Sequence, residues 1–268
     1  MEDIQHSIAE PATDPAKPLN VERSHWLLLN SGLCAPAFNM ALDEALLEFL
    51  ARLGKPVLRL YGWTEPAATF GYFQKFAEIE RATLLRPLIR RPTGGGLVPH
   101  DADWTYSLAF PAGHEWYLLR AEESYRRAHE WIQAAFTRLD IPTNLAPQSR
   151  SSPRVEALSE IRNDQSHLTS AATKEMPGEC FVGHEKSDLL WQGRKIAGAA
   201  QRRTRAGLLI QGSVQPPPVG LRRADWEKAM VAVMRRTWED FQPDAALCER
   251  TAWLGAQKYS QAAFLKKR

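Results

Sequence analysis

The sequence predicts an α+β fold in which a mixed or antiparallel sheet is flanked by helices. Helix-like and strand-like runs follow one another without the regular β-α-β alternation of a parallel sheet. Three strand-like runs that are separated by Gly193 and Gly207 predict an antiparallel meander in the C-terminal half. The chain has 268 residues, of which 44% are hydrophobic and 24% are charged, so it can bury a sizeable core.

The N-terminal half is expected to alternate strands with two helices. Apolar residues recur with helical spacing from residue 36 to residue 53, and Gly54 is a plausible stop. A second apolar stripe predicts one long helix over residues 117–139. Strands are predicted at residues 25–29, 57–61, 88–91 and 104–110, the last of them returning from a glycine-rich turn.

The C-terminal half combines the predicted meander with two closing helices. Its strands are expected at residues 187–191, 195–203 and 208–214, and its helices at residues 223–241 and 260–267. Residues 1–22 are rich in Pro, Ala and acidic residues and predict a disordered tail. Residues 23–268 then form a single domain, in which the polar segment 145–178 is a mobile loop.

Composition excludes several classes of protein. The formal charge of +3 is far from the footprint of a dedicated nucleic-acid binder. Three cysteines without a CxxC pair do not form a disulfide framework and fit a reducing compartment. No apolar run reaches the roughly 18 residues of a membrane helix, and no basic, apolar leader is present. Seven histidines without HExxH or a Cys/His cluster predict no metal site. A soluble, cytoplasmic protein is expected.

The most informative stretch is the glycine-rich turn Gly94-Gly95-Gly96, which follows a predicted strand. Three glycines let backbone N–H groups approach a ligand, and the preceding Arg90 and Arg91 add positive charge for a phosphate or carboxylate. An ordinary glycine-rich hairpin explains the stretch equally well when it is taken alone. Neither GxGxxG nor the P-loop spacing is present, so neither a Rossmann nor a Walker site follows.

A second candidate is Lys195, which lies on a predicted strand and is followed by small residues. Gly198, Ala199 and Ala200 leave room for an unbranched chain beside a single ammonium group. Taken alone, a solvated strand lysine is the more common explanation. The basic runs at 202–205 and 222–223 are expected to be solvated faces, with docking of acidic carrier proteins as the functional alternative.

Cys180 is the third candidate, fifteen positions before Lys195. A cation beside a cysteine lowers the pKa of its thiol and makes it a nucleophile, whereas the alternative is a small buried side chain. Cys34 and Cys248 are given that structural interpretation. His100 and His184 are candidates for a supporting role, although a lone histidine is more often a hydrogen-bonded structural group.

Together these stretches resemble the lipoate–protein ligase and octanoyltransferase family, whose fold is shared with biotin–protein ligases. The resemblance runs over about residues 25–215 and includes NMALDE (39–44), RLYGW (59–63), FGYFQ (70–74), RRPTGGGLVPHD (90–101), WTYS (104–107), GRKIAGAAQRR (193–203) and QGSV (211–214). It implies a catalytic domain of the biotin/lipoate ligase type, with an acyl chain lying between the glycine-rich turn and the lysine strand.

Two chemistries compete within that family. Ligases use ATP and Mg²⁺ to form lipoyl-adenylate, whereas carrier-dependent octanoyltransferases use an acyl-cysteine and need no cofactor. The ligases usually carry Arg-Asn-Asp ahead of the lysine, where this chain has Cys180-Phe181. That difference favours the transferase, and the intact Gly-Gly-Gly, which is more usual in ligases, keeps the ATP-dependent alternative open.

The transferase interpretation assigns roles to particular residues. Cys180 and Lys195 are the expected catalytic residues, acyl carrier protein is the donor, and a lysine of a lipoyl-domain protein is the acceptor. Neither nucleic acid nor a membrane is expected as a partner. An inactive module that only binds lipoyl or biotinyl protein is a further alternative. The expected substrate-binding residues are Arg91, Thr93, Gly94, Gly95, Gly96, His100, Gly198 and Ala199.

Overall fold

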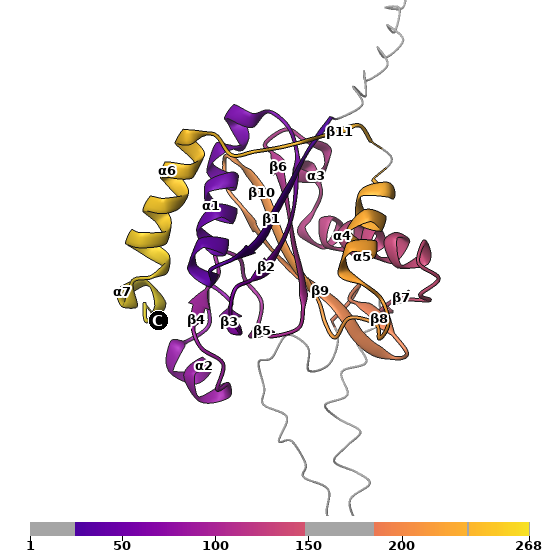
Figure 1. The fold of residues 1–268 in the computed structure, drawn as a ribbon, viewed down its shortest axis with the longest axis horizontal. Helices are drawn as coiled ribbons and strands as arrows, with labels where there is room; N and C mark the ends of the chain where they lie inside the picture. The colour runs from indigo at the N-terminus through magenta and orange to yellow at the C-terminus, as the bar shows by residue number, and fades with distance from the viewer. Residues whose placement is uncertain (1–24, 148–184, 235, 268) are drawn as a thin grey trace, which may run out of the picture.

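A computed structural model describes residues 25–147, 185–234 and 236–267 of the chain. Its eight-stranded mixed sheet has the order β11-β1-β2-β6-β10-β9-β8-β7, and a second, three-stranded sheet has the order β4-β3-β5. Helices α1 and α6 cover one face of the large sheet, and α3, α4 and α5 cover the other (Figure 1). The predicted α+β class, a sheet flanked by helices, is therefore confirmed.

The element bounds are as follows. The large sheet consists of β1 (Trp26–Cys34), β2 (Val57–Trp63), β6 (Trp104–Pro111), β7 (Asn144–Leu145), β8 (Leu189–Trp191), β9 (Arg194–Arg203), β10 (Gly207–Val214) and β11 (Trp238–Asp240). The small sheet consists of β3 (Ala67–Phe70), β4 (Leu88–Arg90) and β5 (Val98–His100). The helices are α1 (Pro36–Leu53), α2 (Phe76–Ala82), α3 (Glu115–Leu118), α4 (Ala121–Thr137), α5 (Arg223–Ala232), α6 (Ala245–Leu254), the π-helix Gly255–Tyr259 and α7 (Ala262–Leu265).

The centre of the large sheet is buried on both faces. Strand β10 is buried along its whole length and pairs antiparallel with β6 on one side and β9 on the other. The predicted meander β8-β9-β10 is confirmed, and Gly193 makes its first turn with a φ of 76°. Among the strand pairs of this sheet that the structure describes, only β1–β2 and β1–β11 are parallel.

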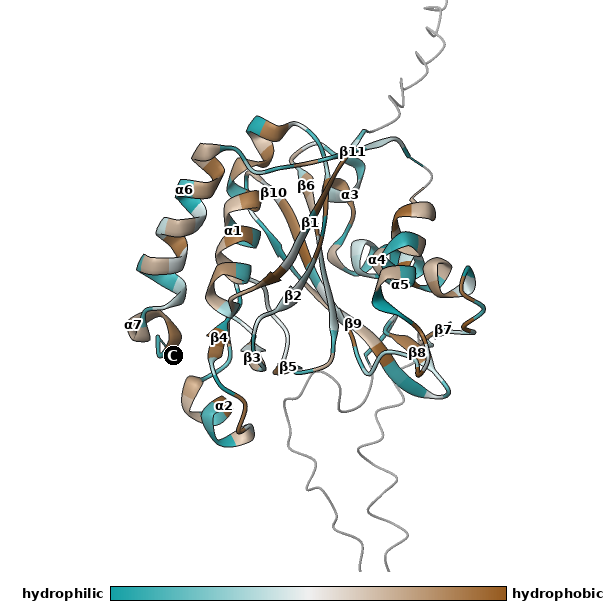
Figure 2. Ribbon diagram, in the orientation of Figure 1, coloured by the Kyte–Doolittle hydropathy of each residue, from teal (hydrophilic) through white to brown (hydrophobic). Residues whose placement is uncertain are grey.

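The layer formed by α1 and α6 is built on the predicted helix. Helix α1 spans Pro36–Leu53 and ends where Gly54 adopts the left-handed conformation, with a φ of 65°. The N–H of Gly54 donates to the carbonyl of Leu50, which satisfies a carbonyl at the end of the helix. Figure 2 shows hydrophobic and hydrophilic residues alternating around the covering helices, as expected for helices that pack on a sheet and also face solvent.

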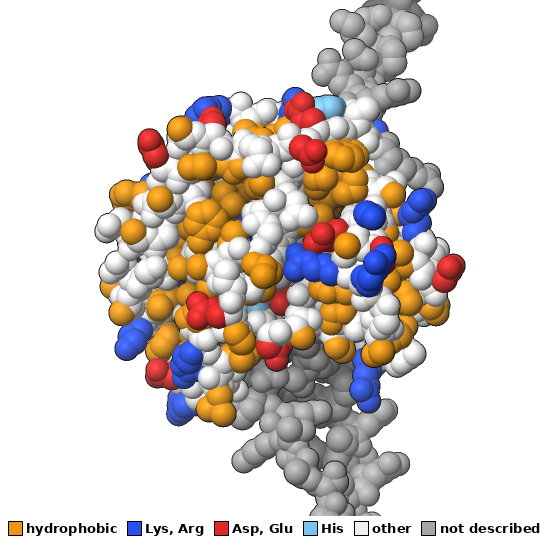
Figure 3. Space-filling view, viewed as in Figure 1, with side chains coloured by type: hydrophobic (Ala, Val, Ile, Leu, Met, Phe, Trp, Pro, Cys, Tyr) orange, Lys and Arg blue, Asp and Glu red, His pale blue; other side chains and the backbone are white. Residues whose placement is uncertain are grey.

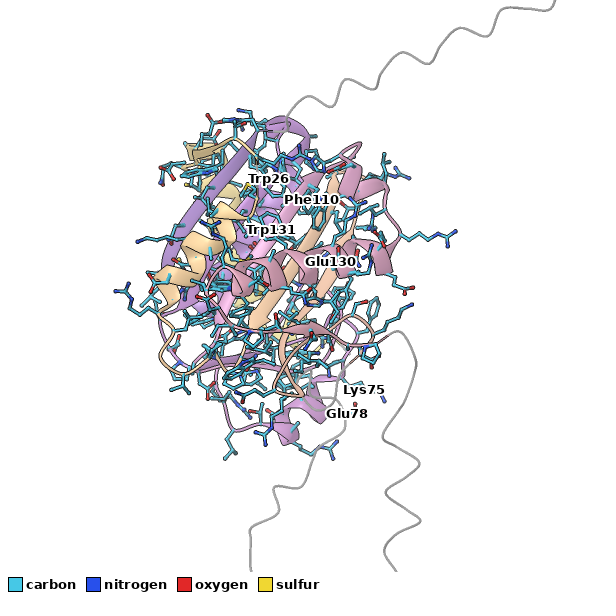
Figure 4. The ribbon with its side chains drawn as sticks, turned by 90° about the vertical axis from the view of Figure 1, so that its right-hand side faces the viewer. Trp26, Lys75, Glu78, Phe110, Glu130 and Trp131 are labelled. Atoms are coloured by element: carbon cyan, nitrogen blue, oxygen red, sulfur yellow. The ribbon has the colours of Figure 1, made fainter. Side chains whose placement is uncertain are left out.

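The opposite layer packs through aromatic side chains. Trp26 of β1 contacts Phe110 of β6 edge-on at 5.4 Å between ring centroids and Trp131 of α4 at 5.2 Å. Figure 4 shows these three side chains gathered between the sheet and α4. Trp131 also donates its indole N–H to the carbonyl of Met230 on α5, so one residue joins both helices to the sheet.

The small sheet positions the glycine-rich turn. Strands β4 and β5 lie on opposite sides of β3, so the turn at residues 94–96 connects strands that are not neighbours. The predicted return of the chain through residues 104–110 is wrong, because β5 makes the return and β6 belongs to the large sheet. The ordinary hairpin explanation of the turn fails for the same reason.

Two predicted helices are shorter than expected. The run over residues 117–139 is interrupted between α3 and α4, where Leu119 and Arg120 are extended with ψ values of 153° and 154°. The run over residues 223–241 ends as α5 at Ala232, and its last residues form β11 on the edge of the sheet. Pairing with β1 overrides the helical pattern there, since Trp26 N–H donates to the Thr237 carbonyl.

Several elements had no predicted counterpart. Strand β3, helix α2 and helix α6 were not expected, whereas α7 coincides with the predicted short closing helix. The predicted tail at residues 1–22 and most of the predicted mobile loop lie outside the described residues. In the part of the chain that the structure describes, no helix has the length and apolar character needed to cross a membrane.

Candidate active site

A pocket lies between the small sheet and one end of the large sheet. Its lining comes from α1, β2, β3, β5, β6, β9, β10 and the start of the glycine-rich segment. The lining residues are Met40, Tyr61, Trp63, Thr69, Arg91, Val98, His100, Thr105, Gly198, Ala199, Ala200, Gln211, Gly212 and Ser213. The small residues expected to leave room for a chain, Gly198, Ala199 and Ala200, therefore do line a pocket.

His100 connects two walls of this pocket. Its Nε2 lies 2.8 Å from Oγ1 of Thr69, and its Nδ1 lies 2.9 Å from Oδ2 of Asp103. The ring also stacks on Trp63 at 3.9 Å between centroids. His100 is therefore held at both nitrogens and on one face, as its structural interpretation predicts, while it still forms part of the pocket wall.

Asp103 lies behind His100 and accepts hydrogen bonds from several side chains. Its Oδ2 also accepts hydrogen bonds from Thr105 at 2.8 Å and from Ser213 at 2.7 Å. Burial alone would raise the pKa of Asp103, but the charge of His100 and these hydrogen bonds outweigh it and lower the pKa. A buried carboxylate thus fixes side chains from three strands behind the pocket.

The glycine-rich turn is fixed by Arg91. The buried guanidinium donates to the carbonyls of Gly94 at 2.7 Å and Gly96 at 2.8 Å, and to Thr69 Oγ1 at 3.1 Å. A Cβ atom on Gly71 would lie 1.9 Å from the carbonyl oxygen of Gly95, so the two backbones approach closely. Arg91 lines the pocket, and its observed role is to hold the turn.

Thr93 reaches the far side of the site. Its hydroxyl donates to Oε1 of Gln211 at 2.7 Å, and Nε2 of Gln211 donates to Oδ2 of Asp43 at 2.7 Å. Asp43 also accepts from Arg59, at 2.7 Å, and from Tyr61 and Ser107. We call Asp43, Arg59, Tyr61, Ser107 and Gln211 the Asp43 network; it joins α1 to the strands below the glycine-rich turn.

Lys195 lies on the other side of the sheet, toward α4. Its Nζ is 2.7 Å from Oδ2 of Asp188, and the two side chains are 6% and 0% exposed. Asp188 Oδ1 accepts from the hydroxyl of Tyr125 at 2.6 Å, and Oδ2 accepts from the N–H of Glu185 at 2.7 Å. Lys195 is therefore a buried, paired cation, and the solvated-lysine explanation is wrong.

Two further polar side chains lie near this pair. Burial lowers the pKa of His129 on α4 to about 4, so the ring is neutral at pH 7. Burial, and next the charge of Asp188, raise the pKa of Tyr106 on β6. We call Asp188, Lys195, Tyr125, His129 and Tyr106 the Asp188 cluster; it contains the ion pair between Lys195 and Asp188.

The structure brings four of the predicted site residues together in the pocket wall and places five others outside it. Gly198, Ala199, Arg91 and His100 line the pocket, whereas Thr93, Gly94, Gly95, Gly96 and Lys195 are not among its lining residues. Ala199 links the two parts, because its N–H lies 3.5 Å from the hydroxyl of Tyr125. Cys180 and His184 lie outside the described residues.

Sequence reasoning missed Asp43, Asp103 and Asp188. Asp43 carried a usable signal, since it is an acidic residue amid the apolar positions of α1. Cys34 is half-buried and donates its thiol to the carbonyl of Ser31 at 3.2 Å, so it is less buried than its structural interpretation predicts. Cys248 is exposed on α6, which contradicts a buried role. Figure 3 shows Lys and Arg side chains dispersed among Asp and Glu on the face it displays.

The fold is similar to that of lipoate-protein ligases of known structure. A crystal structure of lipoate-protein ligase A bound with ATP superposes with a TM-score of 0.67 at 17% identity, covering 91% of this chain and 98% of that one. A bipartite lipoate protein ligase from Thermoplasma acidophilum gives 0.62 at 16% identity, covering 90% and 96%. The family profile of the lipoyl protein ligase A/B catalytic domain matches residues 35–215. The chain belongs to this family.

Curated relatives share more sequence with the chain. Octanoyltransferase LipM of Anoxybacillus flavithermus is 35% identical over 200 residues, and the match covers 72% of this chain and 66% of the relative. Octanoyltransferase LipM of Geobacillus kaustophilus is 36% identical over 195 residues, with coverages of 70% and 64%. The chain thus spans slightly less than two thirds of the length of these relatives.

Proposed function

We propose that the protein transfers an octanoyl group from acyl carrier protein to a lysine of a lipoyl-domain protein, through an acyl intermediate on Cys180. Membership of the lipoyl protein ligase A/B family supports a reaction of this class. Relatives at 35% and 36% identity are named octanoyltransferases, which supports the carrier-dependent chemistry over ATP-dependent ligation.

The pocket is the observation that carries the proposal. Each polar side chain in its lining has a partner within the protein, including Thr69, His100 and Gln211. Polar groups that are already paired offer little to a polar ligand, whereas Met40, Val98 and Ala200 offer apolar contact. A short unbranched hydrocarbon chain fits such a lining.

The chemistry divides into two exchanges at one sulfur. The Cys180 thiolate attacks the thioester carbonyl, and a bond forms between the carbonyl carbon and the sulfur of Cys180. The bond from that carbon to the pantetheine sulfur breaks, and the carrier's thiolate leaves and takes up a proton. The neutral amine of the acceptor lysine then attacks the acyl-Cys180. The amide forms, the amine loses a proton, and the Cys180 thiolate is released.

Lys195 assists both exchanges in this proposal. A free thiol with a pKa near 8.5 is only a few per cent ionised at pH 7, so a nearby cation increases the reactive thiolate. The same ammonium can donate to the oxyanion that develops on the carbonyl oxygen. Thioester exchange is nearly isoenergetic and amide formation drives the second step, so the reaction requires neither ATP nor a metal.

The test is to incubate the full chain with octanoyl-acyl carrier protein and a lipoyl domain, with and without ATP. We expect octanoyl transfer without ATP, and a covalent octanoyl adduct by intact mass when the acceptor is omitted. Cys180→Ala should lose both the adduct and the transfer, while Cys248→Ala, a change at an exposed cysteine of α6, should keep both.

The opposite result would identify the ligase. If Cys180→Ala modified the acceptor at the wild-type rate from free octanoate or lipoate with ATP and Mg²⁺, the transferase proposal would be wrong. Binding of the lipoyl domain without any transfer under either condition would instead favour the inactive module. Comparing octanoyl with lipoyl donors in the same assay determines which acyl group is preferred.

A further inference from the structure

We propose that Asp188 is a positioning residue that keeps Lys195 in its protonated form, so that Lys195 acts as a charged hydrogen-bond donor and not as a proton acceptor. The inference rests on the proposed function, because it specifies how Lys195 works in that reaction. It adds a residue that sequence reasoning did not single out, and it decides what the lysine can do in each exchange.

The geometry of the Asp188 carboxylate comes first. Both oxygens are engaged: Oδ1 accepts from Tyr125 at 2.6 Å, and Oδ2 accepts from Glu185 N–H and lies 2.7 Å from Lys195 Nζ. The backbone of Asp188 is also fixed, since its carbonyl accepts from Ala146 and its N–H donates to Glu185. The carboxylate therefore cannot turn away from the lysine without breaking several hydrogen bonds.

The burial of both side chains makes the charge of Lys195 depend on its pairing with Asp188. The Lys195 side chain is 6% exposed and that of Asp188 is 0% exposed, so water contributes little to either charge. A buried ammonium without an anion is strongly disfavoured, whereas a buried pair at hydrogen-bond distance keeps both charges. Asp188 thus makes a charged lysine possible at this depth.

The other groups around the pair do not replace Asp188. Helix α4 contributes Tyr125 and His129, and β6 contributes Tyr106. His129 is neutral at pH 7 because burial lowers its pKa to about 4, and burial raises the pKa of Tyr106, so both remain uncharged. Among the described residues of this cluster, Asp188 supplies the negative charge that faces Lys195.

The position of the pair connects it to the pocket. Tyr125, which donates to Asp188, also lies 3.5 Å from the N–H of Ala199 in the pocket wall. A charged donor held at this point can stabilise a thiolate or an oxyanion without giving up its proton. The role of Asp188 is indirect, since it acts through the orientation and charge of Lys195.

The first test needs no substrate. Acetic anhydride acylates neutral amines and not ammonium groups, so trace labelling of the folded chain measures how much of Lys195 is neutral. At pH 8 we expect Asp188→Asn to raise the labelling rate of Lys195, read by peptide mass spectrometry, by at least about tenfold. Asp225→Asn, which removes a partly exposed carboxylate on α5, should leave that rate unchanged.

The second test separates charge from packing. Asp188→Asn should lower kcat for octanoyl transfer roughly 100-fold, with a smaller change in KM, and should move the alkaline limb of the pH–rate profile to lower pH. In a Lys195→Arg background the charge is permanent, so the same substitution should not move that limb. A purely structural role would lower the rate without changing the profile in either background.

The outcomes are distinct. Equal labelling of Lys195 in the wild type and in a folded Asp188→Asn variant would overturn the inference. If Asp188→Asn does not fold, Tyr125→Phe removes one hydrogen bond from the same carboxylate and should raise labelling by a smaller factor; no rise would overturn the inference as well. If the wild type transfers no octanoyl group, the proposed function fails, and the labelling result still decides the state of Lys195.

Discussion

Two buried aspartates lie on opposite sides of the large sheet and illustrate two uses of one residue type. On the α1 side, Asp43 accepts from Arg59, Tyr61, Ser107 and Gln211, so both of its oxygens have two donors. On the α4 side, Asp188 pairs with a single lysine and is held by one hydroxyl and one backbone N–H.

The cations differ as much as the anions do. The Arg59 guanidinium is planar and permanently charged, and it also donates to Ser31 at 2.9 Å and to the side chain and backbone of Asn39 at 2.6 and 2.9 Å. The lysine ammonium is compact, and it can redirect its three donors. The Asp43 network is therefore a rigid structural support, whereas in the function proposed above the lysine of the Asp188 cluster interacts with the reacting group.

The remaining polar atoms support this distinction. In the Asp43 network, each hydroxyl and amide named above has a partner. In the Asp188 cluster, the hydroxyl of Tyr106 is buried without a hydrogen-bond partner among the residues that the structure describes. A fully paired network rigidifies a core, and an incompletely paired one is more common at functional sites.

The largest expected effect on the free energy of unfolding comes from removing the Asp43 carboxylate from its network. Asp43→Asn keeps the shape of the side chain but leaves the Arg59 guanidinium buried without its carboxylate. We expect the free energy of unfolding to fall by about 3–5 kcal/mol, as measured by urea denaturation. Asp225→Asn at the exposed Arg222 pair should change it by less than about 0.5 kcal/mol. If Asp43→Asn lowered the free energy of unfolding as little as the control does, the structural role of the Asp43 network would be contradicted.

Elements whose sequence signals are local could be predicted, and elements that depend on contacts with distant residues could not. Helix α1 was predicted to the residue because its apolar stripe, its initial proline and Gly54 all act within the helix. Strand β11 was missed because residues 238–240 carry a helical pattern that pairing with β1 overrides. The break between α3 and α4 was missed because two extended residues interrupt a stripe that continues on both sides.

The site follows the same rule. Gly198 and Ala199 could be predicted as pocket walls because small side chains on a strand leave space beside it, whatever the rest of the fold. Asp188 could not be assigned to Lys195 from the sequence, since the β8–β9 hairpin and its register decide that the two side chains meet. Arg91 was predicted to bind the substrate, and the structure places it in the pocket lining, where its guanidinium also donates to two carbonyls of its own turn.

The next prediction concerns pH on the α4 side. Burial lowers the pKa of His129 from 6.5 to about 4 in the folded protein. Between these values the unfolded chain binds a proton that the folded chain excludes, so stability falls as the pH decreases from 6.5 toward 4. The full effect is about 3 kcal/mol, since one pKa unit corresponds to about 1.4 kcal/mol.

His129→Phe tests this dependence. Phenylalanine keeps an aromatic ring beside Tyr125, which packs edge-on against His129 at 4.4 Å, but it cannot take up a proton. The free energy of unfolding of the variant, measured by urea denaturation at several pH values, should fall less steeply below pH 6.5. An equally steep fall in the variant would assign the acid sensitivity to other groups.

The smallest expected effect compares one hydroxyl from each side of the sheet. Tyr61→Phe removes a hydroxyl that donates to Asp43 at 3.0 Å, so it should lower the free energy of unfolding by about 1–2 kcal/mol. Tyr106→Phe removes a buried hydroxyl that has no partner in the described part of the chain, so it should be neutral or stabilising by up to about 1 kcal/mol. Both variants keep the aromatic ring, so urea denaturation of the pair isolates the hydroxyl. If Tyr106→Phe were as destabilising as Tyr61→Phe, the Tyr106 hydroxyl would have a hydrogen-bond partner in solution. The buried hydroxyls on the two sides of the sheet would then contribute equally to stability.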